Sequence, residues 1–311
     1  MTVGVGMIPP AGGSPASQAE ALAAMADAGL DHAVVGDHVS FFGGFGIDGL
    51  VHAAALSMLH PTLPVHTCVY LLALRHPVLV ARQLSTIASL APGRLVLGVG
   101  IGGEDRHEVA VCGVDPRTRG RRMDACIETV KALMTGEAVT HHGEFFTFDD
   151  AVVQPPPAVP IPILVGGRSE AALQRAGRYG EGWLGIWVSP ERYSAATITA
   201  ADAAERAGRD ATSLRHGLTV WCGFGDDAAH GRAQVAPVME GLYGLPFERF
   251  ERYVPTGPPD VVAEALQPFV ELGCASFSLL ARGRSADATV EAAAEVRRLL
   301  QVGRRGGALS S

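Results

Sequence analysis

The chain has 311 residues, of which 48% are hydrophobic, enough to bury the core of one large domain or of two small ones. Its formal net charge of -7 argues against nucleic acid or an anionic membrane as a partner, because either would require a concentrated face of Lys and Arg. No apolar run reaches the roughly 20 residues of a membrane span, and the start, MTVGVGMIPP, lacks the regions of a signal peptide. Five scattered cysteines without C-x-x-C spacing indicate reduced thiols, so we expect a cytoplasmic protein.

Short apolar segments alternate along the chain with longer segments of helical periodicity. The predicted strands are residues 3–8, 32–36, 65–72, 95–99, 162–165, 183–187, 218–223 and 276–280. The predicted helices are residues 17–28, 50–59, 77–90, 121–134, 169–178, 190–207, 259–272 and 286–300. Gly29 after the first helix, and Pro77 and Pro190 at the start of two others, are typical helix boundaries.

The predicted strands are continuously apolar, which indicates strands covered on both faces, as in a parallel sheet. Eight strand–helix units in a chain of this length predict an α/β fold, a closed (β/α)8 TIM barrel; an open Rossmann-like sheet is the alternative. We expect one barrel domain over residues 1–302 and a disordered tail over residues 303–311. Two stretches interrupt the alternation, 136–161 after the fourth strand and 225–258, which contains an extra helix, after the seventh. We expect these insertions to cover the barrel mouth.

In such a barrel the chemistry takes place at the C-terminal ends of the strands. The second predicted strand leads into Asp37 and His38, and the third ends near Cys68 and Val69. The fourth and fifth lead into the glycine-rich turns GVGIGGE and GGRSE. Such turns can hold an anionic group on backbone N–H donors, although the glycines are also compatible with ordinary barrel turns.

The string Gly98-x-Gly100-x-x-Gly103 matches the dinucleotide-binding fingerprint, but its context does not. It follows the fourth strand instead of opening the first βαβ unit, and no helix begins directly after it. The adjacent pair His141 and His142 has no third ligand at a useful spacing, so we predict no metal site.

One segment, LRHPVLVARQLSTIASLAPGRLVLGVGIGG at 74–103, resembles the most distinctive segment of the bacterial luciferase-like monooxygenase superfamily. Companion segments match in the same order: GDHV at 36–39, RRMDACIETVKALMTGEAVTHHGEFFTF at 121–148, PIPILVGGRSEAALQRAGRYGEGW at 160–183 and TGPPDVVAEALQPFVELG at 256–273. The resemblance implies a (β/α)8 barrel, a flavin or deazaflavin at its carboxyl rim, and redox chemistry at that ring. The Asp-His pair is similar to that of the branch that uses the deazaflavin coenzyme F420.

The resemblance also implies which residues form the site. His38 would be the catalytic residue, and the peptide bond between Cys68 and Val69 would be cis, in a bulge that supports the cofactor ring. The predicted cofactor-binding residues are Asp37, Cys68, Val69, Gly100, Gly102, Gly103, Gly166, Gly167, Arg168 and Ser169. The predicted substrate contacts are Glu104 and Trp187, although Trp187 is equally compatible with barrel packing.

Adjacent residues of a strand point to opposite faces, so we expect separate roles for the Asp-His pair. His38 would face the reacting centre as a general acid or base, because an imidazole titrates near neutral pH. Asp37 would contact the polar edge of the cofactor.

The chain departs from the pattern of relatives that oxidise sugar phosphates. Those relatives carry Glu directly after the glycine of strand four, whereas here Gly103 stands at that position and Glu104 follows it.

Three functions are compatible with this pattern. The first is an oxidoreductase that transfers hydride between coenzyme F420 and a small organic substrate. The second is a monooxygenase that uses reduced FMN and O2. The third is a barrel without catalysis that only binds a ligand, against which the Asp-His pair and the glycine-rich turns argue. The resemblance also implies a homodimer.

Overall fold

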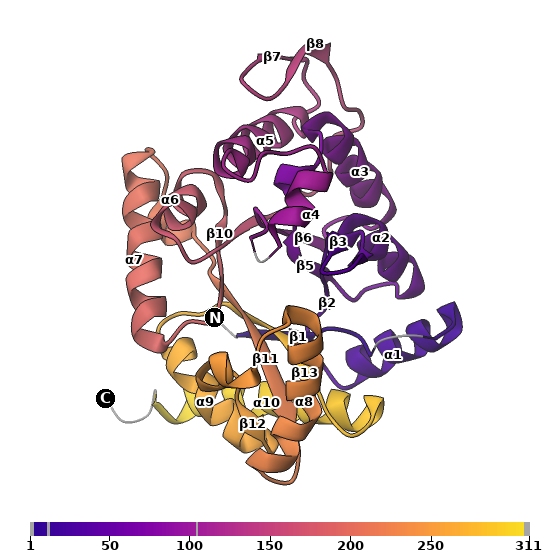
Figure 1. The fold of residues 1–311 in the computed structure, drawn as a ribbon, viewed down its shortest axis with the longest axis vertical. Helices are drawn as coiled ribbons and strands as arrows, with labels where there is room; N and C mark the ends of the chain where they lie inside the picture. Colours follow the sequence, from indigo (N-terminus) through magenta and orange to yellow (C-terminus); the bar gives the residue numbers. More distant parts are fainter. Residues whose placement is uncertain (1–2, 11–12, 104, 308–311) are drawn as a thin grey trace. The chain divides into compact units, whose positions relative to one another are not determined.

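The computed structural model describes residues 3–10, 13–103 and 105–307, with backbone alone for residues 303–307 (Figure 1). Its main parallel strands are β1 (Gly4–Met7), β2 (His32–Val35), β5 (Val65–Tyr70), β6 (Leu95–Val99), β9 (Ile163–Gly166), β10 (Gly182–Ile186), β11 (Gly217–Phe224) and β13 (Ser276–Arg282). Hydrogen bonds connect them in the order β10-β9-β6-β5-β2-β1-β13-β11, and β11 pairs again with β10. This last pairing closes the sheet into a (β/α)8 barrel, which confirms the predicted fold class.

The helices that alternate with these strands lie close to their predicted positions. They are α1 (Pro15–Asp27), α2 (Gly49–Leu59), α3 (Pro77–Leu90), α5 (Arg119–Leu133), α6 (Glu170–Tyr179), α7 (Pro190–Arg206), α9 (Pro259–Glu271) and α10 (Ala286–Gly307). Polar side chains cap several of them: Ser14 accepts a hydrogen bond at the start of α1, Asp48 at α2 and Ser169 at α6. α10 continues to Gly307 and so includes part of the predicted tail, while residues 308–311 lie outside the described residues.

Shorter elements interrupt the alternation. They are the hairpins β3 (His38–Phe41) with β4 (Phe45–Ile47) and β7 (Val139–His142) with β8 (Thr147–Ala151), the helices α4 (Arg106–Val111) and α8 (Ala228–Tyr243), strand β12 (Thr256–Gly257), and the 3-10 helices η1 (Leu72–Leu74), η2 (Ala211–Ser213), η3 (Phe247–Arg249) and η4 (Glu251–Tyr253). Only α8 among them was expected from the sequence. Short elements of this kind carry too little periodicity to be recognised.

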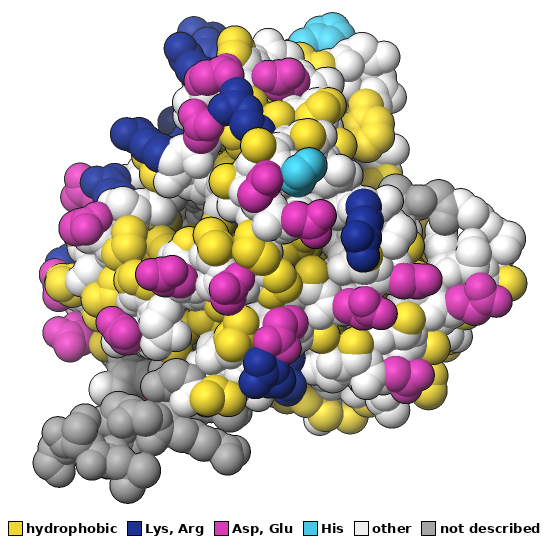
Figure 2. All heavy atoms as spheres, turned by 90° about the horizontal axis from the view of Figure 1, so that it is seen from below, with side chains coloured by type: hydrophobic (Ala, Val, Ile, Leu, Met, Phe, Trp, Pro, Cys, Tyr) yellow, Lys and Arg dark blue, Asp and Glu magenta, His cyan; other side chains and the backbone are white. Residues whose placement is uncertain are grey.

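The chain groups by its internal contacts into two units, residues 1–34, 184–198 and 215–311 in one, and residues 35–183 and 199–214 in the other. In the first unit, α8 packs on an aromatic cluster that joins Trp221 to Phe247 and Phe250. No helix among the described residues combines the length and apolarity that a membrane crossing requires. Figure 2 shows a face on which acidic and basic side chains are interspersed among apolar ones, in keeping with the modest net charge.

In the second unit, the β7–β8 hairpin lies within the first of the two predicted insertions. It connects α5 to β9, and its side chains contact the starts of α3 and α5. The ring of Phe146 lies 5.1 Å from that of His76, the guanidinium of Arg122 lies 4.4 Å from the same phenyl ring, and Arg121 pairs with Glu144. These contacts hold the hairpin beside α3 and α5, as Figure 1 also shows.

The first unit contains a deeply buried histidine on β2. His32 is 2% exposed, and its Nε2 lies 3.2 Å from the hydroxyl of Ser278 on β13. Gly6 on β1 lies directly against it: a Cβ at this glycine would be 2.3 Å from the His32 ring. The glycine therefore makes the room that the imidazole occupies.

His32 should give the protein a defined pH dependence of stability. Burial lowers the pKa of its imidazole from 6.5 to about 3, so the folded protein keeps it neutral while the unfolded chain binds a proton. The neutral imidazole makes its full contribution to the free energy of unfolding above pH 6.5. Below that pH, the free energy of unfolding should fall by up to about 1.4 kcal/mol per pH unit. Urea unfolding at several pH values measures the slope, which His32→Leu should reduce by about one proton. An identical slope in the variant would contradict the assignment.

Candidate active site

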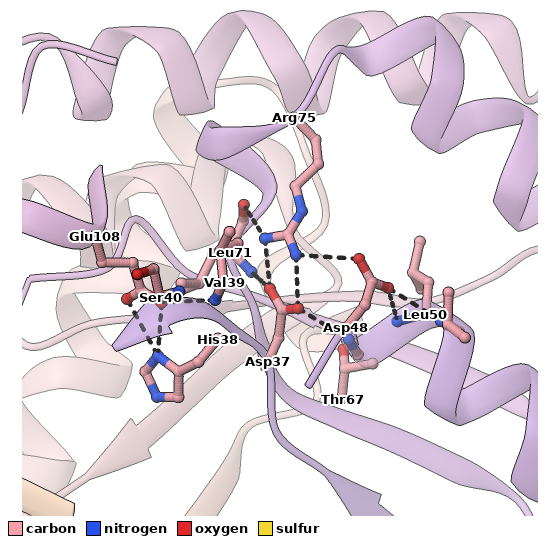
Figure 3. A network of polar contacts seen from close by, with 12 residues as sticks. Asp37, His38, Val39, Ser40, Asp48, Leu50, Thr67, Leu71, Arg75 and Glu108 are labelled. Carbon is pink, nitrogen blue, oxygen red and sulfur yellow. Dashed lines mark hydrogen bonds and ion pairs between the residues drawn. The ribbon is translucent and has the colours of Figure 1, made fainter. Parts of the chain in front are cut away.

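The hairpin that follows β2 carries His38 at its first position. Its imidazole Nδ1 lies 3.1 Å from Oε2 and 3.2 Å from Oε1 of Glu108, and its side chain is 25% exposed. One face of the ring stacks on Phe41 at 3.9 Å between centroids. No hydrogen bond joins Nε2 to another described residue. The imidazole is thus held from one nitrogen, and the other remains available for chemistry (Figure 3).

Glu108 lies in the first turn of α4 and is 1% exposed. Besides the imidazole it accepts hydrogen bonds from the backbone N–H groups of Val39, at 2.7 Å, and Ser40, at 3.3 Å. Burial acts to raise the pKa of this carboxyl, but the hydrogen bonds from His38 and Val39 outweigh it and hold the pKa below its ordinary value. Glu108 is therefore an anion that favours the tautomer of His38 with its proton on Nδ1.

Asp37 points to the opposite side from His38, as the expected division of roles requires (Figure 3). Its Oδ2 accepts hydrogen bonds from Leu71 N at 2.7 Å and Arg75 Nη1 at 2.6 Å. Its Oδ1 accepts from Gly49 N at 2.9 Å and Arg75 Nη2 at 2.7 Å. Asp48 adds a second carboxylate, 3.2 Å from Arg75 Nη2. The carboxylate of Asp37 thus joins the start of α2, the end of β5 and the guanidinium.

The burial of Asp37 gives it a structural role. The residue is 2% exposed and accepts four hydrogen bonds from Gly49, Leu71 and Arg75. Burial raises the pKa of its carboxyl, against the opposing effects of Arg75 and the two N–H groups. Asp37 thus holds together the segments that carry His38, and its contact with the cofactor edge stays a prediction.

The peptide bond between Cys68 and Val69 is cis, as the resemblance predicted, and the pairing of β5 with β6 shifts register across it. The side chain of Val69 lies against two glycines at the neighbouring strand ends. A Cβ at Gly100 would be 2.4 Å from Val69 Cγ2, and one at Gly166 would be 3.0 Å from Val69 Cγ1. The ends of β5, β6 and β9 therefore form a surface with one apolar side chain and bare backbone on both sides.

The second glycine-rich turn leads into α6. Gly167 has a φ of 119°, which favours glycine, and a Cβ there would be 2.8 Å from that of Ala172. Its carbonyl accepts a hydrogen bond from Trp183 Nε1 at 2.7 Å, and Ser169 caps the helix through Ala172 N. Bare backbone at a helix N-terminus is an arrangement that can hold an anion.

The remaining predicted site residues lie in different surroundings. Gly102 and Gly103 lie after β6, where Gly102 has a φ of 68° and a Cβ at Gly103 would be 3.8 Å from Arg119 Nη2. Arg168 is exposed before α6. Trp187 belongs to the first unit, where its ring lies 5.2 Å from that of Tyr243 and 5.0 Å from that of Phe250. Glu104 lies outside the described residues.

Two important residues, Glu108 and Arg75, were not identified from the sequence. The sequence GEDRHE contains both Glu104 and Glu108, but only contact with His38, 70 positions away, distinguishes Glu108. Arg75 was quoted only as part of a motif. A signal was available only for Arg75, which stands just before the predicted helix start at 77, whereas Glu108 lies well away from the predicted strand 95–99 and the predicted helix 121–134. Among the described residues, no group of His, Cys, Asp or Glu side chains is arranged to hold a metal ion.

Comparison with known proteins places this geometry in context. The model of the luciferase-like monooxygenase family matches residues 2–255. An uncharacterised protein of Mycobacterium tuberculosis is 41% identical over 138 residues, which cover 44% of this chain and 47% of that protein, so the match spans less than half of the relative. The F420-dependent glucose-6-phosphate dehydrogenase of Beutenbergia cavernae is 31% identical over 275 residues, covering 79% of this chain and 81% of that enzyme.

Solved structures share the fold. An F420-dependent secondary alcohol dehydrogenase, in complex with an F420-acetone adduct, superposes with a TM-score of 0.84 at 18% sequence identity. The superposition covers 96% of this chain and 99% of that chain. At this level of identity the likeness establishes the barrel architecture.

The network around Asp37 predicts a loss of stability on its removal. Asp37→Asn should cost about 3–5 kcal/mol of unfolding free energy, because it leaves the largely buried Arg75 without its main partner. The matched control is Arg121→Gln, which breaks an exposed ion pair with Glu144 and should cost less than about 1 kcal/mol. Urea denaturation measures both. A stable Asp37→Asn protein with weakened cofactor binding would contradict the structural role and confirm the predicted role of cofactor ligand.

Proposed function

Because the chain belongs to the luciferase-like monooxygenase family, we propose that it is an oxidoreductase that uses the deazaflavin coenzyme F420. One observation carries the proposal: an imidazole at the end of a barrel strand, fixed by a buried carboxylate, with its second nitrogen available. The F420-dependent enzymes among the similar proteins support the choice of cofactor.

The residues at the strand ends fit such a cofactor. A flat ring system could lie against Val69 where Gly100 and Gly166 present no side chains. The phosphate of the cofactor chain would be held at the N-terminus of α6 by Gly167 and Ser169. When bound, the deazaflavin would accept hydride from the substrate carbon or return it. Cys68 would contribute to the wall beside the ring.

His38 would move the proton that accompanies the hydride. In the oxidising direction Nε2 takes the proton of a substrate hydroxyl, and in the reducing direction it returns a proton to the carbonyl oxygen. Glu108 keeps the Nδ1 proton in place and stabilises the imidazolium that forms, because the two groups are 3.1 Å apart. Glu108 is therefore a positioning residue that acts through His38.

A reduced-FMN monooxygenase is the second candidate, and the family description favours it. The same strand ends and helix N-terminus could hold FMN, since both cofactors carry a tricyclic ring and a phosphate. The two differ in chemistry: reduced FMN reacts with O2, whereas the deazaflavin reacts poorly with it. Consumption of O2 by the loaded enzyme would distinguish them.

Cofactor titration followed by fluorescence tests the first proposal. The wild-type protein should bind F420 more tightly than FMN, and Gly167→Val should weaken binding by about 1–3 kcal/mol, because the side chain excludes the phosphate and a backbone hydrogen bond is lost. The control is Gly241→Val on α8, where a Cβ would meet nothing within 4 Å. Unaltered affinity in a folded Gly167→Val protein would contradict the phosphate site.

Steady-state kinetics test the roles of His38 and Glu108. His38→Ala should retain cofactor affinity yet lose about 10²–10⁴-fold in turnover, the usual contribution of an acid–base group. Glu108→Gln should lower turnover about 10²-fold with a shifted pH–rate profile, because the imidazole loses its ionised partner. His142→Ala, on the exposed β7–β8 hairpin, is the control. Full turnover in His38→Ala would rule out His38 as the acid–base group.

A further inference from the structure

We propose that the hairpin of β3 and β4 receives an apolar part of the substrate, so that the substrate class is a hydrophobic alcohol or its ketone. This inference rests on the proposed function and names the substrate for the same site. Residues 39–47, VSFFGGFGI, contain no charged side chain. Four of their side chains are apolar and strongly exposed: Val39 at 45%, Phe42 at 49%, Phe45 at 59% and Ile47 at 45%.

Part of this apolar surface is continuous with His38, although Val39 points to the opposite face of β3. The imidazole stacks on Phe41, and the ring of Phe42 lies 4.4 Å from the ring of Phe41. Ile47 is the direct partner of His38 across the hairpin, and Phe45 is the partner of Phe41. A substrate whose hydroxyl reaches Nε2 of His38 would therefore place its remaining atoms beside these side chains.

The hairpin is held in place before any substrate binds. The backbone N–H of Phe42 donates to Oδ2 of Asp105 at 3.0 Å, and that of Val39 donates to Glu108 at 2.7 Å. Phe42 has a φ of 24°, a conformation that is rare outside glycine. Such a conformation persists only where the surroundings impose it, and it occurs preferentially at functional positions. The carboxylate of Asp105 therefore anchors the backbone of Phe42, whose ring is exposed beside that of Phe41.

The composition of the hairpin selects between substrate classes. A sugar phosphate requires cationic and hydrogen-bonding side chains near the reacting hydroxyl, and this segment offers neither Lys nor Arg. An alkyl or aryl substituent gains from every methylene that leaves water, at about 0.8 kcal/mol, or roughly fourfold in affinity. Exposed apolar surface next to a catalytic group is also typical of a ligand-binding site.

A homologous series of secondary alcohols tests the inference. With F420 as hydride acceptor, kcat/KM of the wild-type protein should rise about fourfold per added methylene from isopropanol to a chain of about eight carbons. In the double variant Phe45→Ser/Ile47→Ser the increment should fall to about 1.5-fold or less. The matched control, Ile198→Ser/Val261→Ser, removes two exposed apolar side chains from α7 and α9 and should keep the wild-type increment.

Competition with anilinonaphthalene sulfonate provides a readout that needs no cofactor. Longer alcohols should displace this apolar fluorophore from the wild-type protein and from the control, but not from the hairpin variant. Equal increments and equal displacement in the hairpin variant would overturn the inference. So would an unchanged increment together with a change from dimer to monomer in sedimentation, which would assign the hairpin to a contact between two copies.

Failure of the wild-type protein to bind F420 would overturn the proposed function. The displacement experiment would then test by itself whether the hairpin binds an apolar ligand.

Discussion

The ion pair between Asp37 and Arg75 is the interaction on which the candidate site depends. A carboxylate that is 2% exposed must have its charge compensated, and here the guanidinium and two backbone N–H groups do so. Those partners belong to the start of α2 and to the segment after β5. The pair therefore fixes the point at which the chain leaves β2, and with it the position of the next residue, His38.

A second pair of carboxylates anchors the hairpin that carries His38. Glu108 and Asp105, both from the start of α4, accept hydrogen bonds from the backbone of β3 and of the turn that follows. Glu108 alone also contacts the imidazole. The helix, the hairpin and the imidazole of His38 thus form one connected polar network, whose buried members are satisfied by each other. Such a network holds the imidazole in place without a substrate.

Steric fit explains the glycines at the ends of β6 and β9 in the candidate site. Gly100 and Gly166 lack side chains because Val69, at the cis peptide, occupies the space that a Cβ would need. Gly167 is required for a different reason, its positive φ next to Ala172. The glycine-rich turns therefore have a structural explanation within the barrel, and the same absence of side chains would give the ring and phosphate of the proposed cofactor access to the backbone. The two explanations are complementary.

The barrel was predictable from the amino-acid sequence, because continuous apolar strands and intervening helical segments are local patterns that the side chains specify directly. The prediction that His38 and the glycine-rich turns belong to one site used the rule that the strand ends of a barrel share one rim. The folded structure was needed to show that Glu108 contacts the imidazole and that Asp37 is enclosed by Arg75. Both contacts join distant segments, and their partners depend on how short elements such as α4 pack. Local periodicity carries no information on such pairings, since burial and charge compensation arise only in the folded chain.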